Sequence, residues 1–305
     1  MRVVAVVATF RRPRELARLL DSLAGVEAIV VCDNAADPET RAVVEQAPGR
    51  AHYLAPATNL GCGGGLRLAE THAAQIEGSA WTHLLVLDDD AVLTPDTIPQ
   101  LRAALDREKA HAAYPLVTGR DGRTGWLPGL RDRARHRLGR EPMVVERYRT
   151  LFGSGVADFD WAQGICLLAT RAAVEAAGYH RDDFWVRGED LDFSLRLTMQ
   201  GRGIFVPAAV VQHLPPESRT PARTRAEYFR HAAMVQNIAF LALTQPQGRR
   251  IRPSIPGASL RFVRTWGVRA IPDLFSALRR GQRGEPAGHR TAGSFRQRFD
   301  ELIAG

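Results

Sequence analysis

Three consecutive carboxylates, Asp88, Asp89 and Asp90, follow directly after the apolar run His83–Leu87. Adjacent carboxylates repel one another, so the cluster is costly unless a cation or hydrogen bonds offset the repulsion. Carboxylate oxygens are preferred ligands of Mg²⁺ and Mn²⁺, including an ion that also holds a diphosphate. Alternate residues of extended chain project to the same side, so Asp88 and Asp90 can address one ligand together. A solvated acidic turn is the alternative, and the buried run before it favours the metal site.

A second acidic group, Glu189, Asp190 and Asp192, opens a predicted helix over Glu189–Gln200. A carboxylate aimed at a substrate hydroxyl can act as a general base where its surroundings keep it ionised. The helix dipole also favours acidic side chains in any first turn, and Asp192 can pair with Arg196 four residues later. Spacing alone leaves the catalytic and the structural interpretation open.

A histidine and a run of glycines give weaker signals. His213 follows the strand-like run Ile204–Gln212. A single histidine is more often structural than a ligand, so His213 is a candidate third metal ligand only beside the aspartates. The segment Asn59–Gly65 contains four glycines, which before a helix allow close backbone approach to a ligand. It has neither a dinucleotide-binding nor a Walker spacing, so a flexible turn is its alternative.

Alternating strand and helix patterns position these groups. Helical spacing follows each of the first two apolar, β-branched runs and a weaker third strand, and this alternation predicts a parallel, doubly wound α/β sheet. Ligands bind outside the carboxyl ends of the strands in such sheets. The predicted strands are Val3–Thr9, Ala28–Cys32, His52–Leu54 and His83–Leu87. Further polar residues at the ends of the first two strands, each explicable alone by turn chemistry, are Thr9, Arg11, Asp33 and Asn34.

The second half is less regular. Residues 119–158 lack clear periodicity and predict a functional loop or lid. Beyond them we expect a strand at Gly164–Ala169, a helix at Arg171–Ala177 and a long helix at Arg223–Leu243. The predicted domains are residues 1–245, catalytic, and residues 246–305, a basic helical extension.

Composition sets further bounds. The 305-residue chain has a formal net charge of +8, which invites nucleic acid, anionic membranes or phosphorylated molecules as partners. Much of that charge resembles a compositional bias towards arginine, so it carries little weight. The chain has three cysteines and no CxxC pair, which favours a reducing, cytoplasmic compartment. The run Val3–Ala8 is too short for a signal peptide, and no apolar run is long enough to span a membrane. A peripheral position on the inner face of the plasma membrane stays open.

The segment Leu260–Arg280 mixes apolar and basic residues at helical spacing. Such a helix can rest on an anionic membrane. Packing on the catalytic domain or an oligomer contact is the alternative. We favour this alternative because Pro272 interrupts the pattern.

Together these motifs resemble the GT-A glycosyltransferases of family 2, from Val3 to about Leu243. The similarity rests on ATFRR, VCDNA, NLGCGGG, LDDDAVLTPD, DWAQGICLL, FWVRGEDLDFSLR and His213. It implies a GT-A (Rossmann-like) α/β fold with a mostly parallel sheet flanked by helices. It also implies metal-dependent transfer of a sugar from a nucleotide-sugar donor to a hydroxyl, in one displacement that inverts the anomeric carbon.

The resemblance also implies roles. Asp88 and Asp90 would bind the donor diphosphate through Mn²⁺ or Mg²⁺, with His213 completing the metal shell. Asp190 would be the general base beside Glu189. The residues expected to bind the nucleotide sugar are Thr9, Arg11, Asp33, Asn34, Asn59, Gly63, Gly64, Asp88, Asp89, Trp161, Gln163 and Gly164.

The acidic triplet followed by Ala-Val-Leu-Thr-Pro-Asp is more similar to bacterial galactofuranosyltransferases than to rhamnosyltransferases. UDP-galactofuranose is therefore the leading donor, and a glycan or lipid-linked molecule of cell-wall or polysaccharide biosynthesis the expected acceptor. Other UDP-hexoses and dTDP-rhamnose remain alternatives.

Three other classes compete. A nucleic-acid-binding protein would interleave aromatic with basic residues, which this chain mostly does not. A nucleotidyltransferase would be expected to carry a glycine-rich basic loop after the first strand, where Phe10–Pro13 stands. An inactive relative acting as a scaffold is disfavoured by the intact acidic groups.

Overall fold

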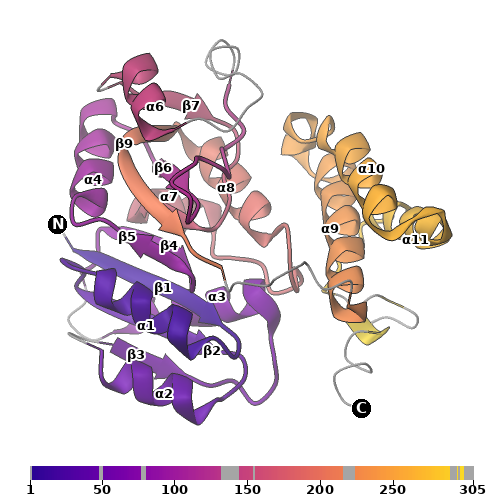
Figure 1. The fold of residues 1–305 in the computed structure, drawn as a ribbon, viewed down its shortest axis with the longest axis horizontal. Coiled ribbons are helices and arrows are strands. Elements are labelled where there is room, and N and C mark those ends of the chain that lie inside the picture. Colours follow the sequence, from indigo (N-terminus) through magenta and orange to yellow (C-terminus); the bar gives the residue numbers. More distant parts are fainter. Residues whose placement is uncertain are drawn as a thin grey trace. The chain divides into compact units, whose positions relative to one another are not determined.

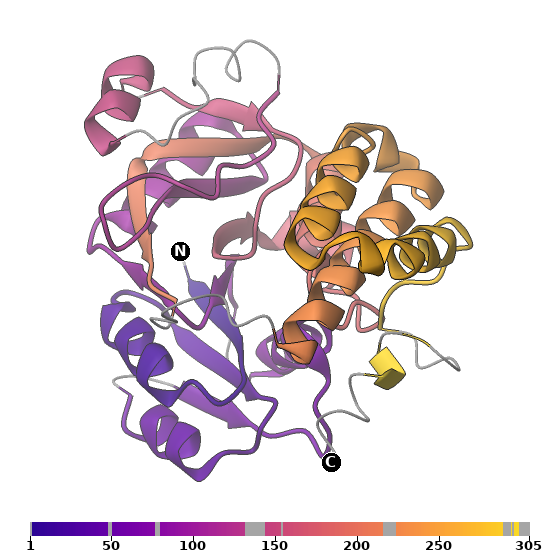
Figure 2. The same ribbon diagram turned by 45° about the vertical axis from the view of Figure 1, so that its right-hand side comes forward.

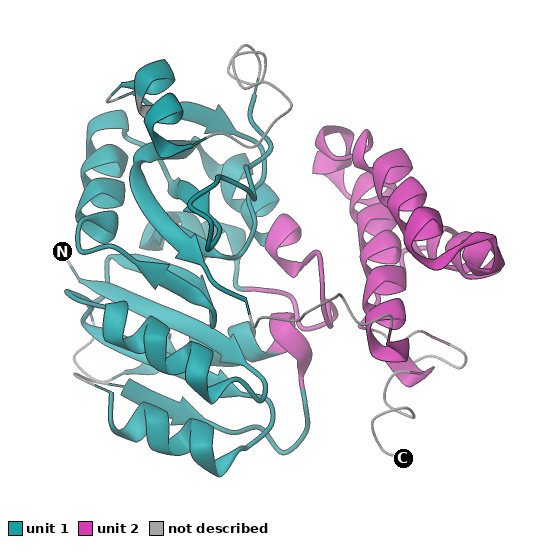
Figure 3. Ribbon diagram, viewed as in Figure 1, with its two compact units in different colours: residues 1–59, 65–179, 193–216 teal, residues 60–64, 180–192, 217–305 magenta. Residues whose placement is uncertain are grey.

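The computed structural model describes residues 2–47, 51–76, 80–131, 144–153, 155–215, 224–288, 294 and 296–298 (Figure 1). The chain forms two compact units (Figure 3). Unit 1 comprises residues 1–59, 65–179 and 193–216, and unit 2 comprises residues 60–64, 180–192 and 217–305. The predicted domain boundary at residue 245 stays a prediction.

Unit 1 is built on one sheet of nine described strands, ordered β3-β2-β1-β4-β8-β6-β9-β5, with β7 also paired to β9. The apolar runs predicted as strands form its centre, because they are buried on both faces. The bounds are β1 Val3–Thr9, β2 Ala28–Asp33, β3 Ala51–Leu54, β4 His83–Asp88, β5 Ala91–Leu93, β6 Ala112–Thr118, β7 Ala157–Phe159, β8 Cys166–Thr170 and β9 Gly203–His213.

The predicted α/β fold is confirmed, with parallel pairing throughout β3-β2-β1-β4. The other half of the sheet is mixed, since β8 runs antiparallel to both β4 and β6 while β6 and β9 are parallel. Strand β6 was not predicted, because Pro115 stands in its middle. The ladder between β6 and β9 shifts register between Pro115 and Leu116, and such an irregularity is where a central strand tolerates proline.

Helices and irregular chain complete unit 1. Pro13 and Pro38 lie in the first turns of α1 and α2, as their fixed φ favours. The segment 119–158 is less irregular than predicted, since it contains α6 and β7, although residues 132–143 lie outside the described chain. The helices are α1 Pro13–Ser22, α2 Pro38–Glu45, α3 Gly61–Gln75, α4 Thr97–Glu108, α6 Val145–Phe152, α7 Arg171–Ala177 and α8 Glu189–Gln200. The first residues of α3 and α8 belong to unit 2.

Unit 2 contains helices that pack on α9 (Figure 2). An apolar cluster that includes Trp185, Phe229, Phe262 and Leu274 joins them. The predicted single amphipathic helix over Leu260–Arg280 is wrong, because Gly267, with φ +82°, ends the first of two helices. Pro272 lies in the first turn of the second, where it is tolerated. The bounds are α9 Arg225–Thr244, η1 Pro246–Arg250, α10 Ser254–Trp266, η2 Val268–Ala270 and α11 Ile271–Gln282. None of the helices in the described ranges is long and apolar enough to cross a membrane.

Candidate active site

The short strand β5 brings the histidine to the aspartates. Strand β4 ends at Asp88, a tight turn follows, and β5 then pairs antiparallel with the end of β9. Ala91 lies opposite His213 in this pairing, and the Leu214 N–H donates to the Asp90 carbonyl at 2.8 Å. Asp90 and His213, which are 123 residues apart in sequence, therefore meet at the carboxyl end of β4.

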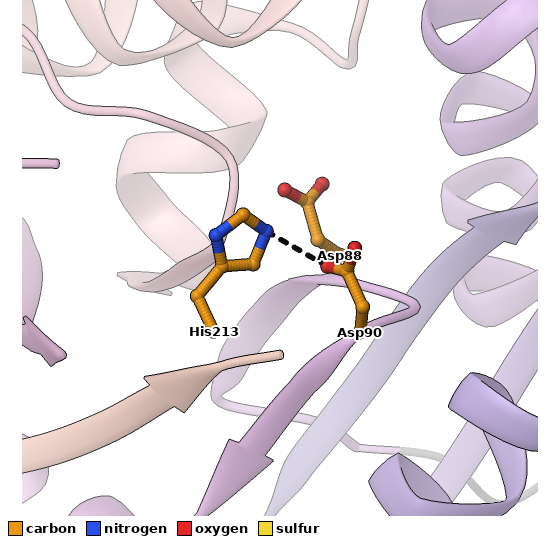
Figure 4. A group of neighbouring side chains, drawn as sticks. All are labelled: Asp88, Asp90 and His213. Carbon is orange, nitrogen blue, oxygen red and sulfur yellow. Dashed lines mark ion pairs between the residues drawn. The ribbon is translucent and has the colours of Figure 1, made fainter. Parts of the chain in front are cut away.

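The side chains of Asp88, Asp90 and His213 converge (Figure 4). One ligand atom from each lies within 4.8 Å of the others, and His213 Nε2 is 2.9 Å from Asp90 Oδ1. Ligands of an octahedral Mg²⁺ lie about 3 Å apart when adjacent and about 4 Å apart when opposite. The spacing is therefore compatible with a small divalent cation held by two carboxylates and an imidazole.

Hydrogen bonding within the cluster is incomplete. Asp90 Oδ1 and His213 Nδ1 are buried and have no hydrogen bond among the described residues, although Oδ1 forms the ion pair with Nε2. The close pair is formed by Oδ1 and Nε2, while Nδ1 lies on the other side of the imidazole ring. A buried carboxylate oxygen with an incomplete set of hydrogen bonds is compatible with a cation at this position.

Arg12 partly neutralises the acidic triplet. Its Nη1 donates to Asp89 Oδ1 at 3.0 Å and to Asp90 Oδ2 at 3.1 Å. Burial works to raise the pKa of Asp90, but His213 and Arg12 outweigh it and hold that pKa below its ordinary value. Asp90 therefore stays ionised, as a metal ligand must be. Arg11 was among the predicted site residues, and Arg12 was not.

The central carboxylate, Asp89, does not belong to the metal-ligand group. It is buried, and its Oδ2 accepts from the Thr9 hydroxyl at 2.7 Å. Burial raises its pKa, against the opposing effect of Arg12 and Thr9. The structure thus places Asp89 and Thr9 together as a buried link between β4 and β1, and their predicted contact with the donor stays a prediction.

The end of β2 carries two more predicted residues. Asp33 is fully buried and accepts from the backbone N–H of Ala35 at 2.9 Å and from the Tyr53 hydroxyl at 2.9 Å. Asn34 is buried beside Gly65, where an added Cβ would lie 2.8 Å from the Asn34 amide nitrogen. Both lie at the edge where the metal-ligand group of unit 1 also lies.

Arg11 adopts a left-handed backbone with φ 55°, and its guanidinium stacks over the Phe10 ring at 5.2 Å. Its side chain is exposed. This conformation separates Arg11 from its neighbour Arg12, which contacts the acidic triplet. A role for Arg11 in nucleotide binding stays a prediction.

The segment 119–158 includes Trp126, which was not among the predicted site residues. Its ring lies edge-on against His213, with centroids 4.5 Å apart, and its backbone is left-handed with φ 49°. The Tyr114 hydroxyl donates to the Trp126 carbonyl at 3.0 Å. An exposed aromatic residue is thus fixed beside a candidate metal ligand.

The predicted segment Trp161–Gly164 lies near the same strand end. Gln163 Nε2 donates to the Leu127 carbonyl at 3.1 Å, and Trp161 packs so closely on Gly129 that a Cβ there would lie 2.3 Å from the indole nitrogen. The Asp88 N–H donates to the carbonyl of Ile165, the residue after Gly164, at 3.2 Å.

In unit 2, the first turn of α8 presents Glu189 and Asp190 in different surroundings. Glu189 is buried, and burial together with the neighbouring Asp190 raises its pKa to about 7, despite a hydrogen bond from Cys62. Asp190 is only partly buried, and its Oδ1 accepts from the Leu191 N–H at 2.8 Å. Asp190 is therefore the more accessible of the two carboxylates.

The glycine run begins α3, so the alternative of a flexible turn does not hold. Within unit 2, Gly61 and Gly63 pack against the segment that precedes α8. A Cβ on Gly63 would lie 2.4 Å from the Phe184 carbonyl oxygen, and one on Gly61 would lie 2.1 Å from that of Trp185. These glycines allow close approach to protein backbone. A contact of Gly63, Gly64 or Asn59 with the donor stays a prediction.

Replacing Gly63 tests this packing. We expect Gly63→Ala to lower the free energy of unfolding by about 2 kcal/mol, because the new methyl group meets backbone carbonyls that cannot move aside cheaply. Gly257→Ala, in helix α10, is the matched control, since nothing lies within 4 Å of its Cβ. It should raise stability by up to about 1 kcal/mol. Equal effects of the two variants in thermal or urea unfolding would contradict the packing role.

Comparison with known proteins decides the class. The family model described as glycosyltransferase like family 2 matches residues 2–233. The chain belongs to this family. It is therefore a transferase enzyme, and the predicted resemblance is confirmed.

Among curated relatives, the galactofuranosyltransferase GlfT1 of Mycobacterium tuberculosis is 28% identical over 205 residues, covering 65% of each chain. GlfT1 of Mycolicibacterium smegmatis is 30% identical over 211 residues, covering 65% of this chain and 66% of the relative. The family 2 chain thus matches about two thirds of the length of these relatives.

Solved structures share the fold. TarS residues 1–349 of S. aureus has a TM-score of 0.58 at 17% identity, covering 94% of this chain and 82% of TarS. GalNAc-T7, solved with UDP, GalNAc and Mn²⁺, has a TM-score of 0.53 at 13% identity, covering 88% of this chain and 57% of that chain. The predicted GT-A fold is confirmed.

Proposed function

We propose that this family 2 enzyme is a metal-dependent, inverting glycosyltransferase that moves a sugar from a UDP-sugar to a hydroxyl of a glycan or lipid-linked acceptor. The observation that carries the proposal is the convergence of Asp88, Asp90 and His213 at the carboxyl end of β4. Similarity to TarS, which was also solved with UDP-GlcNAc (TM-score 0.60, 16% identity), and to GalNAc-T7 supports a UDP-sugar donor.

The metal site would hold the donor through its diphosphate. Asp88, Asp90 and His213 would bind Mn²⁺ or Mg²⁺, and the ion supplies positive charge that stabilises the departing nucleoside diphosphate. His213 and, to a lesser extent, Arg12 keep Asp90 ionised by holding its pKa below the ordinary value. The donor would also contact residues predicted from the resemblance, namely Thr9, Arg11, Asp33, Asn34, Asn59, Gly63, Gly64, Asp89, Trp161, Gln163 and Gly164.

Asp190 would remove the proton of the acceptor hydroxyl as its oxygen attacks the anomeric carbon. The C–O bond to the diphosphate breaks as the new C–O bond forms on the opposite face, so the carbon is inverted without an enzyme nucleophile. Glu189 is adjacent but buried, which favours Asp190 as the group that reaches the acceptor.

UDP-galactofuranose is the donor that we propose first. Support comes from the identity of 28–30% to two proteins named galactofuranosyltransferase and from the triplet that continues as Ala-Val-Leu-Thr-Pro-Asp. Other UDP-hexoses and dTDP-rhamnose are the alternatives, and binding selectivity separates them.

A thermal-shift panel tests the donor and the metal together. We expect UDP-galactofuranose with Mn²⁺ to raise the melting temperature by a few degrees, because a ligand at a hundred times its Kd adds about 2.7 kcal/mol of stability. The same panel includes UDP, GDP, dTDP and other sugars of these nucleotides, each with Mn²⁺ or with EDTA.

The outcome of the panel ranks the donors. A larger shift with dTDP-rhamnose or with another UDP-hexose would replace the proposed sugar while keeping the reaction class. Folded protein that shifts with no nucleotide, with or without metal, would contradict the proposed function itself.

A further inference from the structure

The positive charge of the chain is concentrated in one segment. Residues 246–284 contain nine arginines and a single carboxylate, Asp273, which gives this segment a formal charge of +8. That value equals the formal net charge of the whole chain, so basic and acidic side chains balance over all other residues. Arginine content alone does not explain such a distribution, because a compositional bias would spread the excess along the sequence.

The same segment exposes large apolar side chains. Among the residues that the structure describes, the three most exposed large hydrophobic residues are Val268, Phe275 and Leu260, at 73%, 62% and 59%. All three lie within α10, η2 and α11. Exposed large apolar side chains with basic neighbours are the combination that a surface lying in a membrane interface requires.

These side chains point away from the core of unit 2. Helices α10 and α11 both pack on α9 (Figure 2), with Phe262 and Leu274 in the shared apolar cluster. Phe275, Arg279 and Arg283 follow one another four residues apart along α11 and its C-cap. These three residues line one open hollow. We call the exposed large apolar and basic side chains of α10, η2 and α11, with the residue that ends α11, the outer face; they are Leu260, Arg261, Arg264, Val268, Arg269, Phe275, Arg279 and Arg283.

The arginines of this outer face keep their charge available. The only carboxylate of the segment, Asp273, accepts from the Tyr228 hydroxyl and from Arg298. Glu285, just after the segment, pairs with Arg280 at 2.9 Å. Among the described residues, no ion pair involves Arg261, Arg264, Arg269, Arg279 or Arg283.

We propose that this outer face docks on the surface of an anionic lipid bilayer. A basic surface with projecting apolar side chains lies in the interface plane, where the apolar groups enter the headgroup region. The guanidinium groups then reach lipid phosphates while their stems cover apolar surface. Each arginine near an anionic membrane contributes about 1 kcal/mol. An oligomer contact would bring two copies of this +8 segment together, and their repulsion opposes it.

Vesicle flotation with the full-length protein tests the docking. We expect binding to vesicles of phosphatidylcholine mixed with phosphatidylglycerol, weak or no binding to phosphatidylcholine alone, and release as the salt concentration rises. The triple variant Arg261→Gln, Arg264→Gln, Arg279→Gln should bind at least about tenfold more weakly. Val268→Ser with Phe275→Ser should weaken binding while retaining its preference for the anionic lipid.

The matched control removes three charges from unit 1, as Arg41→Gln, Arg107→Gln and Arg171→Gln. Their side chains are 58%, 51% and 42% exposed, so folding should be retained. Equal weakening by both triple variants, or no preference for phosphatidylglycerol, would overturn the proposal. So would a dimer in analytical ultracentrifugation that the Val268/Phe275 variant abolishes. No sugar donor is present, so the result is independent of the proposed function.

Discussion

Sugar transfer by an Asp88→Asn, Asp90→Asn variant is expected to fall by at least about a thousandfold. The bound metal contributes several kcal/mol to stabilising charge on the leaving group, and each 1.4 kcal/mol corresponds to about tenfold in rate. Both carboxylates of the metal-ligand group lose their charge, and the oxygen 2.9 Å from His213 Nε2 becomes that of a neutral amide. Two quantities are measured, the rate of sugar transfer and the affinity for Mn²⁺. The affinity is obtained from the EPR signal of the unbound ion.

Asp89→Asn is the matched control for this prediction. The same chemical change is made one residue away, on a buried carboxylate that contacts Thr9 and Arg12 and lies outside the metal-ligand group. We expect it to lower the melting temperature while retaining Mn²⁺ affinity. If Asp89→Asn abolishes Mn²⁺ binding as completely as the double variant, the assignment of the metal ligands is wrong.

The first half of the fold could be predicted because local pattern and tertiary role agree there. Strands β1, β2 and β4 are continuous apolar runs, and such runs are what a strand buried on both faces requires. Strand β6 is also buried along its length, but it contains Pro115 and two alanines, which are residue types depleted in strands. Strand β6 forms through its pairing with β9, and the local sequence does not reveal that pairing.

The candidate site likewise contains residues that the sequence predicts and contacts that it does not predict. The acidic triplet follows its strand directly, so Asp88 and Asp90 could be selected from sequence. The contact of His213 with Asp90 depends on β5, a strand of three residues that has no distinctive local signal. Trp126 reaches His213 from a segment without periodicity. Pattern arguments cannot predict such long-range contacts.

Arg11 and Arg12 show a finer limit. The two residues are chemically identical and adjacent, and a left-handed φ at Arg11 decides that Arg12 turns towards the carboxylates. The glycine run shows the complementary case, since glycine spacing is the same whether a phosphate or a carbonyl such as that of Phe184 approaches. The sequence predicts the close approach and leaves the approaching group open.

Asp190→Asn is expected to lower kcat by at least about a hundredfold while leaving the Kd for the donor unchanged. General base catalysis contributes about 10²–10⁴ in rate, and an amide cannot accept the acceptor proton. The substitution keeps the oxygen that accepts from the Leu191 N–H at 2.8 Å, so the first turn of α8 should remain folded. Single-turnover kinetics and calorimetric titration of the donor measure the two quantities separately.

Asp182→Asn provides the control for the loss of charge, because Asp182 is exposed and belongs to the same unit. It should leave kcat within about twofold of the parent enzyme, as surface substitutions usually do. A base role also predicts that the rate of the parent enzyme falls at acidic pH, because the base becomes protonated. This acidic limb of the pH–rate profile should be absent in Asp190→Asn. If the variant keeps more than about a tenth of the parent rate and the same acidic limb, another group removes the proton. Glu189, with its pKa near 7, would then be the residue to test.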